Sequence, residues 1–121
     1  MTQVLIVDDE PNIVISLDFL MKQQGYTTTT AGDGRAALTE ADRVKPDLVL
    51  LDITLPELDG FQVCEQLRTG HGDHMKIIML TARGREAEVA KGLALGANAY
   101  LTKPFSTREL VEKVHELLGD G

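Results

Sequence analysis

Four short apolar runs in this sequence each end on a polar side chain with chemistry of its own. If the runs are parallel strands of one sheet, their ends meet at its carboxyl edge, where open α/β sheets carry their sites. Three carboxylates, a hydroxyl and an ammonium at that edge predict a site for a divalent cation and a phosphoryl group. The runs and the residues that follow them are 4–7 before Asp8 and Asp9, 48–51 before Asp52, 77–80 before Thr81, and 99–102 before Lys103.

Helical patterns alternate with these runs along the chain. A threonine-rich segment at 26–31 predicts one further, less buried strand. Ser106 and Glu109 have the spacing of a capping box at the start of the last helix. Strands that alternate with helices predict a parallel sheet with helices on both faces and right-handed crossovers, but they leave the strand order open. Apolar spacing predicts helices around 13–21, 37–44, 61–67, 89–94 and 110–118, with a polar loop at 70–73.

Composition narrows the class of protein. The 121 residues suit one domain that buries about two-thirds of its unfolded surface. A net charge of −7 without a basic block argues against nucleic-acid binding. Cys64 is the only cysteine, which fits a small core residue in a reducing compartment. The chain starts without a signal-peptide pattern and contains no apolar stretch of about 20 residues, so we expect a soluble, cytoplasmic protein with no membrane contact.

The predicted edge has a defined chemistry. Asp8, Asp9 and Asp52 would repel one another by roughly 4 kcal/mol per pair at ~4 Å and an effective dielectric of 20, so the cluster must bind a cation or a proton. Oxygen ligands without cysteine or nearby histidine favour Mg²⁺ with bound waters. A carboxylate beside Mg²⁺ can attack phosphorus to form an acyl phosphate, while the ammonium of Lys103 neutralises the transferring group. Thr81 could then donate its hydroxyl to a phosphoryl oxygen.

Each of these residues taken alone has a simpler interpretation. An aspartate after a strand is usually a turn residue or helix cap, a threonine such as Thr81 a core hydroxyl, and a lysine such as Lys103 a solvated charge. Tyr100 by itself suggests a half-buried packing residue. The three histidines have no ligand spacing and are predicted to be exposed: His71, His74 and His115.

Four segments together make the sequence resemble the receiver domains of bacterial two-component response regulators. They are VDDEP at 7–11, DITLPELDG at 52–60, LTA at 80–82 and GANAYLTKPF at 96–105. Their order and spacing are highly specific, and the resemblance covers essentially the whole chain. It implies a flavodoxin-like, doubly wound fold with a five-stranded parallel sheet of order 2-1-3-4-5 and five flanking helices.

The resemblance also implies roles for individual residues. Asp52 would be the phosphoacceptor. Asp9, Asp52 and the backbone carbonyl of Thr54 would bind Mg²⁺ directly, and Asp8 would act through a bound water. Lys103 would pair with Asp52 at rest and with the phosphoryl group afterwards. The Lys103-Pro104 peptide bond would be cis.

A conformational switch is implied in the same way. Thr81 would move to the phosphoryl group, and Tyr100 would turn inward and remodel the surface of the fourth helix, fifth strand and fifth helix. The phosphodonor would be a histidine kinase or histidine phosphotransfer protein. The partner that recognises the phosphorylated surface would be a downstream protein or a missing output domain. Such a chain is not an enzyme beyond its own phosphorylation and dephosphorylation. Asn98 and Ala99 replace two acidic residues that many family members use in dimers, so we expect a monomer or a weak phosphorylation-dependent dimer.

The sequence leaves several alternatives open. Residues 1–121 are expected to form a single receiver domain without an output domain, either a natural single-domain regulator or a receiver excised from a longer protein. An aspartate-nucleophile phosphatase usually has aspartates two apart after its first strand, unlike Asp8-Asp9-Glu10. A flavodoxin-like cofactor module shares the topology but requires a phosphate loop, and the acidic loop here would repel phosphate.

Overall fold

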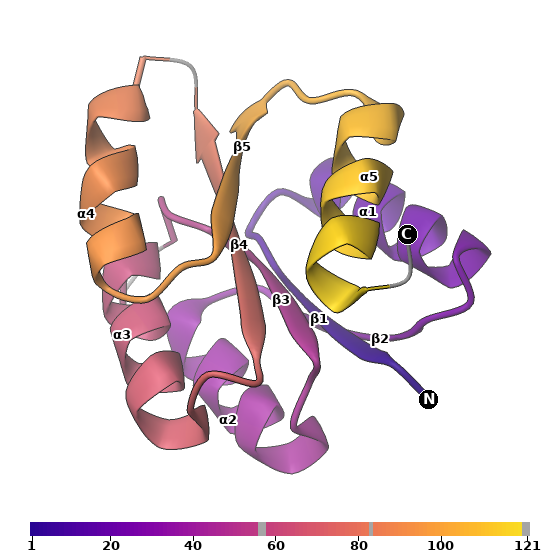
Figure 1. Ribbon diagram of the computed structural model, residues 1–121, viewed down its shortest axis with the longest axis horizontal. Helices are drawn as coiled ribbons and strands as arrows, with labels where there is room; N and C mark the ends of the chain where they lie inside the picture. The colour runs from indigo at the N-terminus through magenta and orange to yellow at the C-terminus, as the bar shows by residue number, and fades with distance from the viewer. Residues whose placement is uncertain (56–57, 83, 120–121) are drawn as a thin grey trace.

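The computed structural model describes residues 1–55, 58–82 and 84–119, so Pro56 and Glu57 of the DITLPELDG segment lie outside the described residues. Strands and helices alternate along the chain, as the sequence predicts (Figure 1). In chain order the elements are β1 (Gln3–Val7), α1 (Pro11–Gln23), β2 (Thr27–Ala31), α2 (Gly34–Val44), β3 (Leu48–Asp52), α3 (Gly60–His71), β4 (Lys76–Ala82), the 3-10 helix η1 (Glu86–Glu88), α4 (Val89–Ala94), β5 (Ala99–Lys103) and α5 (Thr107–Leu118).

The strands form one parallel sheet of order β2-β1-β3-β4-β5, which confirms the fold that the resemblance implied. Helices α1 and α5 cover one face, and α2, α3 and α4 cover the other (Figure 1). This places β1 and β3 side by side at the centre, so the residues that follow them are neighbours. No helix in the described part of the chain is both long and apolar enough to cross a membrane.

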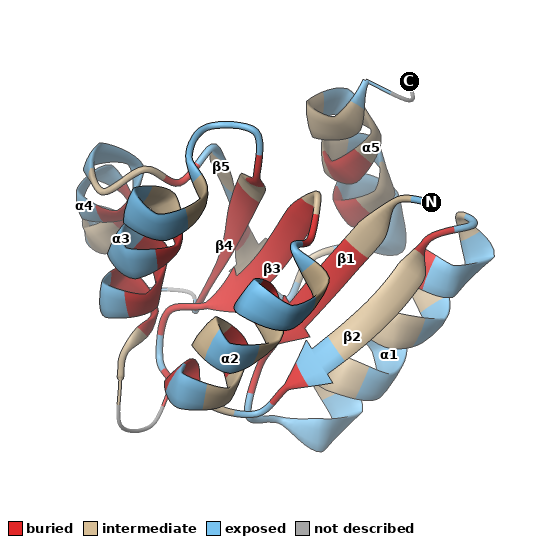
Figure 2. Ribbon diagram, turned by 90° about the horizontal axis from the view of Figure 1, so that it is seen from below, coloured by how far each residue is buried: buried red, intermediate tan, exposed pale blue. Residues whose placement is uncertain are grey.

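The core is divided in two by the sheet. All five residues of β3 are buried (Figure 2). Its apolar side chains alternate between the two layers of the core. Val49 and Leu51 pack under α2 and α3, whereas Leu48 and Leu50 pack under α1 and α5. Burial on both faces is the reason that the β3 sequence is continuously apolar instead of alternating.

Local signals set the starts of the helices that leave the functional edge. Asp59 caps α3 and Ser106 caps α5, each within a complete capping box, which confirms the predicted start of the last helix. α1 begins with Pro11, whose fixed φ suits a first helical position. These helix starts fix where the loops that follow β1, β3 and β5 end.

The predictions that His71 and His115 are exposed were wrong, because both side chains contact residues from other segments of the chain. α3 continues through His71 into the predicted polar loop. The His71 ring lies 3.0 Å from Asp42 of α2, and its side chain is only 12% exposed. His115 is half-buried and packs edge-on against Tyr26. His74 is exposed as predicted, and Cys64 is a buried core residue as predicted.

Candidate functional site

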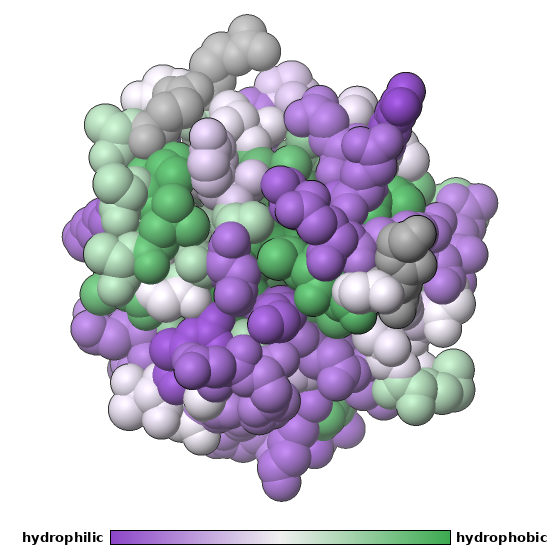
Figure 3. Space-filling model, viewed as in Figure 1, coloured by the Kyte–Doolittle hydropathy of each residue, from purple (hydrophilic) through white to green (hydrophobic). Residues whose placement is uncertain are grey.

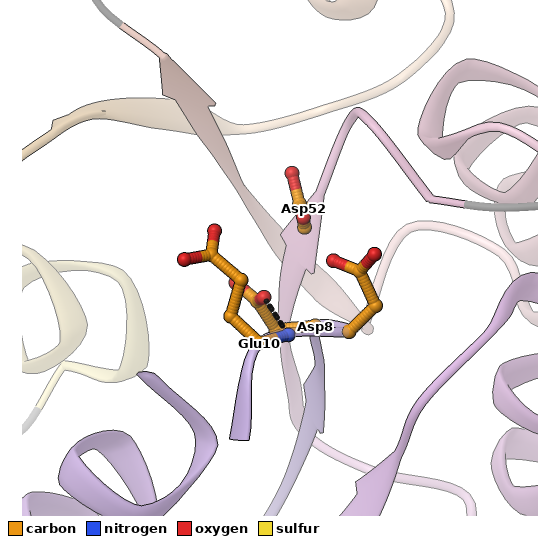
Figure 4. Close-up of side chains that lie close together, drawn as sticks. Asp8, Glu10 and Asp52 are labelled. Carbon is orange, nitrogen blue, oxygen red and sulfur yellow. Dashed lines mark hydrogen bonds between the residues drawn. The ribbon is translucent and has the colours of Figure 1, made fainter. Parts of the chain in front are cut away.

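The predicted polar residues gather at the carboxyl edge of the sheet. Asp8 follows the last residue of β1, and Asp52 is the last residue of the adjacent β3, where Val7 is in register with Leu51. Ligand atoms of Asp8, Asp9, Glu10 and Asp52 all lie within 4.8 Å of one another. Figure 4 shows these strand ends, with the dashed hydrogen bond from the backbone of Glu10 to Asp8. The sheet topology therefore produces the acidic cluster that the sequence predicts.

The site has a buried floor and an exposed rim. Asp8 and Asp52 are 1% and 2% exposed, whereas Asp9 and Glu10 are exposed. Buried carboxylates are unfavourable unless a cation or hydrogen-bond donors compensate their charge. A positive charge at the floor of the site would therefore stabilise the two buried carboxylates.

The two oxygens of Asp52 have different environments. Oδ1 accepts hydrogen bonds from the backbone N–H of Thr54 at 3.0 Å and from its hydroxyl at 2.9 Å. Oδ2 is buried and has no hydrogen-bond partner among the described residues. One oxygen is therefore fixed by the following turn, and the other keeps its lone pairs available for a metal ion or an electrophile.

Lys103 provides the ammonium and forms the implied ion pair with Asp52, but its nearest partner is Asp8. Its Nζ lies 2.8 Å from Asp8 Oδ2 and 3.2 Å from Glu10 Oε1. The distance from Nζ to Asp52 Oδ2 is longer, at 3.7 Å. Burial acts to lower the pKa of Lys103, but the hydrogen bond to Asp8 and the charges of Asp52 and Asp8 outweigh it, so the pKa is raised. Lys103 therefore carries its charge in the site and is held first by Asp8.

Asp8 has a perturbed ionisation as well. Burial raises its pKa above the ordinary aspartate value. Hydrogen bonds from Lys103 and from the Glu10 N–H lower the pKa, but they do not offset burial together with the repulsion from Asp52. Ionisation of Asp8 is thus less favourable in the folded protein than in the unfolded chain, and a bound cation would offset this difference.

The donor set fits a hard divalent ion. Like charges 4.8 Å apart repel by about 3.5 kcal/mol at an effective dielectric of 20. Among the described residues, the ammonium of Lys103 pairs with three of the four carboxylates, those of Asp8, Glu10 and Asp52. All of the cluster's ligand atoms are carboxylate oxygens, which suit Mg²⁺. Oδ2 of Asp52, which is buried without a hydrogen-bond partner among the described residues, is a further sign that this edge is built for a ligand.

Thr81 and Tyr100 lie on the β4–β5 side of the site. Thr81 is fully buried, and its hydroxyl lies 3.4 Å from the hydroxyl of Thr102, its register partner in β5. Tyr100 is 43% exposed, so its ring is not enclosed by the sheet and helices. The Lys103-Pro104 peptide bond that leaves β5 is cis.

Two contacts in the site were not foreseen from the sequence. Glu10 joins the cluster and contacts Lys103, and Thr102 pairs with Thr81. Glu10 follows directly after two predicted site residues, so its position was the only available signal. The Thr102 contact depends on the β4–β5 register, which the sequence does not contain.

The response regulator receiver domain family matches the chain over residues 4–115. The chain therefore belongs to the response regulator receiver domain family.

Its relatives are response regulators. The chain is 46% identical to sensory transduction protein RegX3 of Mycobacterium tuberculosis (strain ATCC 25618 / H37Rv) over 121 residues, which is 100% of this chain and 52% of RegX3. It is 47% identical to the alkaline phosphatase synthesis transcriptional regulatory protein PhoP of Bacillus subtilis (strain 168) over 116 residues, 96% of this chain and 48% of PhoP. The chain thus spans about half the length of the curated relatives it matches.

A solved structure shares the fold. The receiver domain of sensor histidine kinase PA1611 from Pseudomonas aeruginosa PAO1 superposes with a TM-score of 0.88 at 32% identity, covering 98% of both chains. That domain is described with a magnesium ion coordinated in its active site cleft.

Proposed function

We propose that this chain is a phosphoryl-accepting switch, in which Asp52 takes a phosphoryl group from a histidine kinase or histidine phosphotransfer protein in a Mg²⁺-dependent reaction. The observation that carries the proposal is the geometry of Asp52, whose Oδ2 is buried, accepts no hydrogen bond from the described part of the chain and is surrounded by carboxylates and an ammonium. Membership of the receiver family and the magnesium-bound relative support the same function.

Each residue of the site has a separate role in phosphoryl transfer. Oδ2 of Asp52 attacks phosphorus, the bond from phosphorus to the donor nitrogen breaks, and its electron pair leaves with the imidazole. Asp9, Asp52 and the backbone carbonyl of Thr54 would hold Mg²⁺, with Asp8 acting through a water. When bound, Mg²⁺ neutralises charge on the transferring oxygens. Thr54 keeps Oδ1 in place during the attack.

The switch follows from the charge that arrives. Phosphorylation adds roughly −1.5 to −2 charges and three strong acceptors. Lys103 pairs with the new oxygens, Thr81 exchanges Thr102 for a phosphoryl oxygen, and Tyr100 turns inward. A bistable surface is thereby biased by a local charge.

The surface that a partner reads lies on α4, β5 and α5. Figure 3 shows apolar residues over α4, and Leu93 of this helix is 42% exposed. A downstream protein or an output domain binds there. The chain acts in the cytoplasm, as a monomer or a weak phosphorylation-dependent dimer, and catalyses only its own phosphorylation and dephosphorylation.

Intact mass spectrometry after treatment with acetyl phosphate tests the proposal. The wild-type chain should gain one phosphoryl group in Mg²⁺ and none in excess chelator, and Asp52→Asn should gain none. An unmodified wild type, or an equal adduct on Asp52→Asn, would overturn the assignment. Repeated turnover of a phosphomonoester would instead support a phosphatase.

Metal binding is tested separately. Asp9→Ala should lose most of its Mg²⁺ affinity, measured by calorimetry, because it removes an accessible carboxylate of the cluster. Unchanged affinity would refute the metal role of Asp9 while leaving Asp52 as the phosphoacceptor.

A further inference from the structure

Glu10 has a contact in the site that its place in the sequence does not explain. It is the N-cap residue of α1, with an extended backbone (φ −95°, ψ 110°), yet its side chain makes no capping hydrogen bond. Its carboxylate instead reaches Lys103, with Oε1 3.2 Å from Nζ. Its backbone N–H donates to Asp8 Oδ1 at 2.9 Å. The same residue thus holds both Asp8 and the ammonium that Asp8 binds.

These contacts hold the Lys103 ammonium outside hydrogen-bond distance of Asp52 Oδ2. Hydrogen bonds from nitrogen to oxygen extend to about 3.2 Å, so Lys103 bonds Asp8 and Glu10, whereas Asp52 Oδ2 at 3.7 Å lies beyond this range. An ammonium has three N–H donors and two are used here. Among the described residues the third donor has no hydrogen-bond acceptor within this range, so it can serve an acceptor that arrives with the phosphoryl group.

The separation matters for nucleophilic attack. An ammonium hydrogen-bonded to Asp52 Oδ2 would occupy a lone pair of the oxygen that must bond to phosphorus. At 3.7 Å the ammonium still exerts Coulomb attraction on the developing charge without occupying that lone pair. Once the bond to phosphorus forms, the phosphoryl oxygens are new acceptors for the third N–H donor.

We propose that Glu10 is a positioning residue for phosphoryl transfer, which together with Asp8 holds the Lys103 ammonium off the nucleophilic oxygen of Asp52. The inference rests on the proposed function and deepens it. In the reaction with acetyl phosphate, the Asp52 Oδ2–phosphorus bond forms, the phosphorus–oxygen bond to the acetyl group breaks, and acetate leaves with the electron pair. No proton has to move in this step.

The test compares Glu10→Ala and Glu10→Gln with Glu112→Gln. Glu112 is an exposed residue of α5 that pairs with Arg108, so its variant matches the change in net charge without touching the site. Rates of phosphorylation are measured against acetyl phosphate concentration at saturating Mg²⁺. Because the Glu10 side chain is 61% exposed, we expect Glu10→Ala to lower the maximal rate about two- to five-fold. Glu10→Gln, which keeps an acceptor oxygen, should lose less, and Glu112→Gln should match wild type.

Two further measurements separate positioning from simpler electrostatics. In a Lys103→Ala background, Glu10→Ala should have no further effect on the maximal rate, because the residue that it positions is gone. A crystal structure of Glu10→Ala should place Lys103 Nζ within hydrogen-bond distance of Asp52 Oδ2.

Several outcomes would overturn the proposal. One is an unchanged maximal rate in Glu10→Ala, and another is an equal loss when Lys103 is absent. A change confined to the Michaelis constant, or to Mg²⁺ affinity, would assign Glu10 to donor or metal electrostatics instead. If the wild type takes no phosphoryl group, the proposed function fails together with the inference. If the wild type is phosphorylated and the Glu10 variants react at the same rate, the inference fails alone.

Discussion

Replacing Gly60 by alanine should disturb the loop that carries Asp52. Gly60 is the first residue of α3, and its N–H donates to the carbonyl of Ile53 at 3.1 Å. A Cβ atom at Gly60 would lie 2.4 Å from Ile53 Cα and 2.6 Å from the carbonyl oxygen of Asp52. Both are backbone atoms, which cannot rotate out of the way as a flexible side chain can.

The cost can be worked from this contact. Ordinary carbon contacts are about 3.5–4.0 Å, so the backbone after β3 has to move by about 1 Å or more. Overpacking of this kind costs roughly 1–3 kcal/mol of unfolding free energy. Because the displaced atoms belong to Asp52 and its neighbour, we also expect slower labelling of Gly60→Ala by acetyl phosphate.

Gly70→Ala is the matched control within the same helix. A Cβ at Gly70 meets no atom within 4 Å, so the change should stabilise the protein by about 0.5–1 kcal/mol through helix propensity. Urea unfolding followed by circular dichroism gives both free energies. If Gly60→Ala were as stable as Gly70→Ala and were phosphorylated at the wild-type rate, the close approach of α3 to β3 would not be what positions Asp52.

Three other variants test separate parts of the site. Because burial raises the pKa of Asp8, the folded protein binds this proton more tightly than the unfolded chain does, and stability rises as the pH falls through the raised value. Asp8→Asn should therefore be more stable than wild type in urea at neutral pH, by a margin that shrinks in acid; equal stability at neutral pH would contradict this. Thr102→Val removes the hydroxyl 3.4 Å from Thr81 and should destabilise the resting state by about 0.5–1.5 kcal/mol. It should bind the phosphoryl mimic beryllofluoride several-fold more tightly by fluorescence or NMR titration, whereas Thr102→Ser should match wild type. Phe19 is 60% exposed on α1, the helix whose Ile15 lines a hollow beside Asp8 and Asp9. We expect a protein donor that reaches Asp52 to contact this exposed face of α1. Phe19→Ala should therefore slow phosphotransfer from a histidine kinase and leave labelling by acetyl phosphate unchanged; equal slowing of both would point to damage in the site itself.

The elements of this fold could be predicted from the sequence because their signals are local. A continuously apolar run indicates a strand covered on both faces, as β3 is, and the Ser106 and Glu109 spacing indicates the start of α5. The shared edge also follows, because parallel strands place all their carboxyl ends on one side. The sequence alone therefore assigns Asp52 and its acidic neighbours to one site.

Tertiary structure alone decided how the residues at that edge pair. Lys103 and Asp8 are 95 positions apart in the chain, and the closed fold makes Asp8, instead of Asp52, the first partner of the ammonium. The contact of Glu10 with Lys103 and the pairing of Thr81 with Thr102 have the same origin. Periodicity and capping depend on residues a few positions apart, whereas these contacts depend on strand register and on which side chain fills the space between neighbouring strand ends.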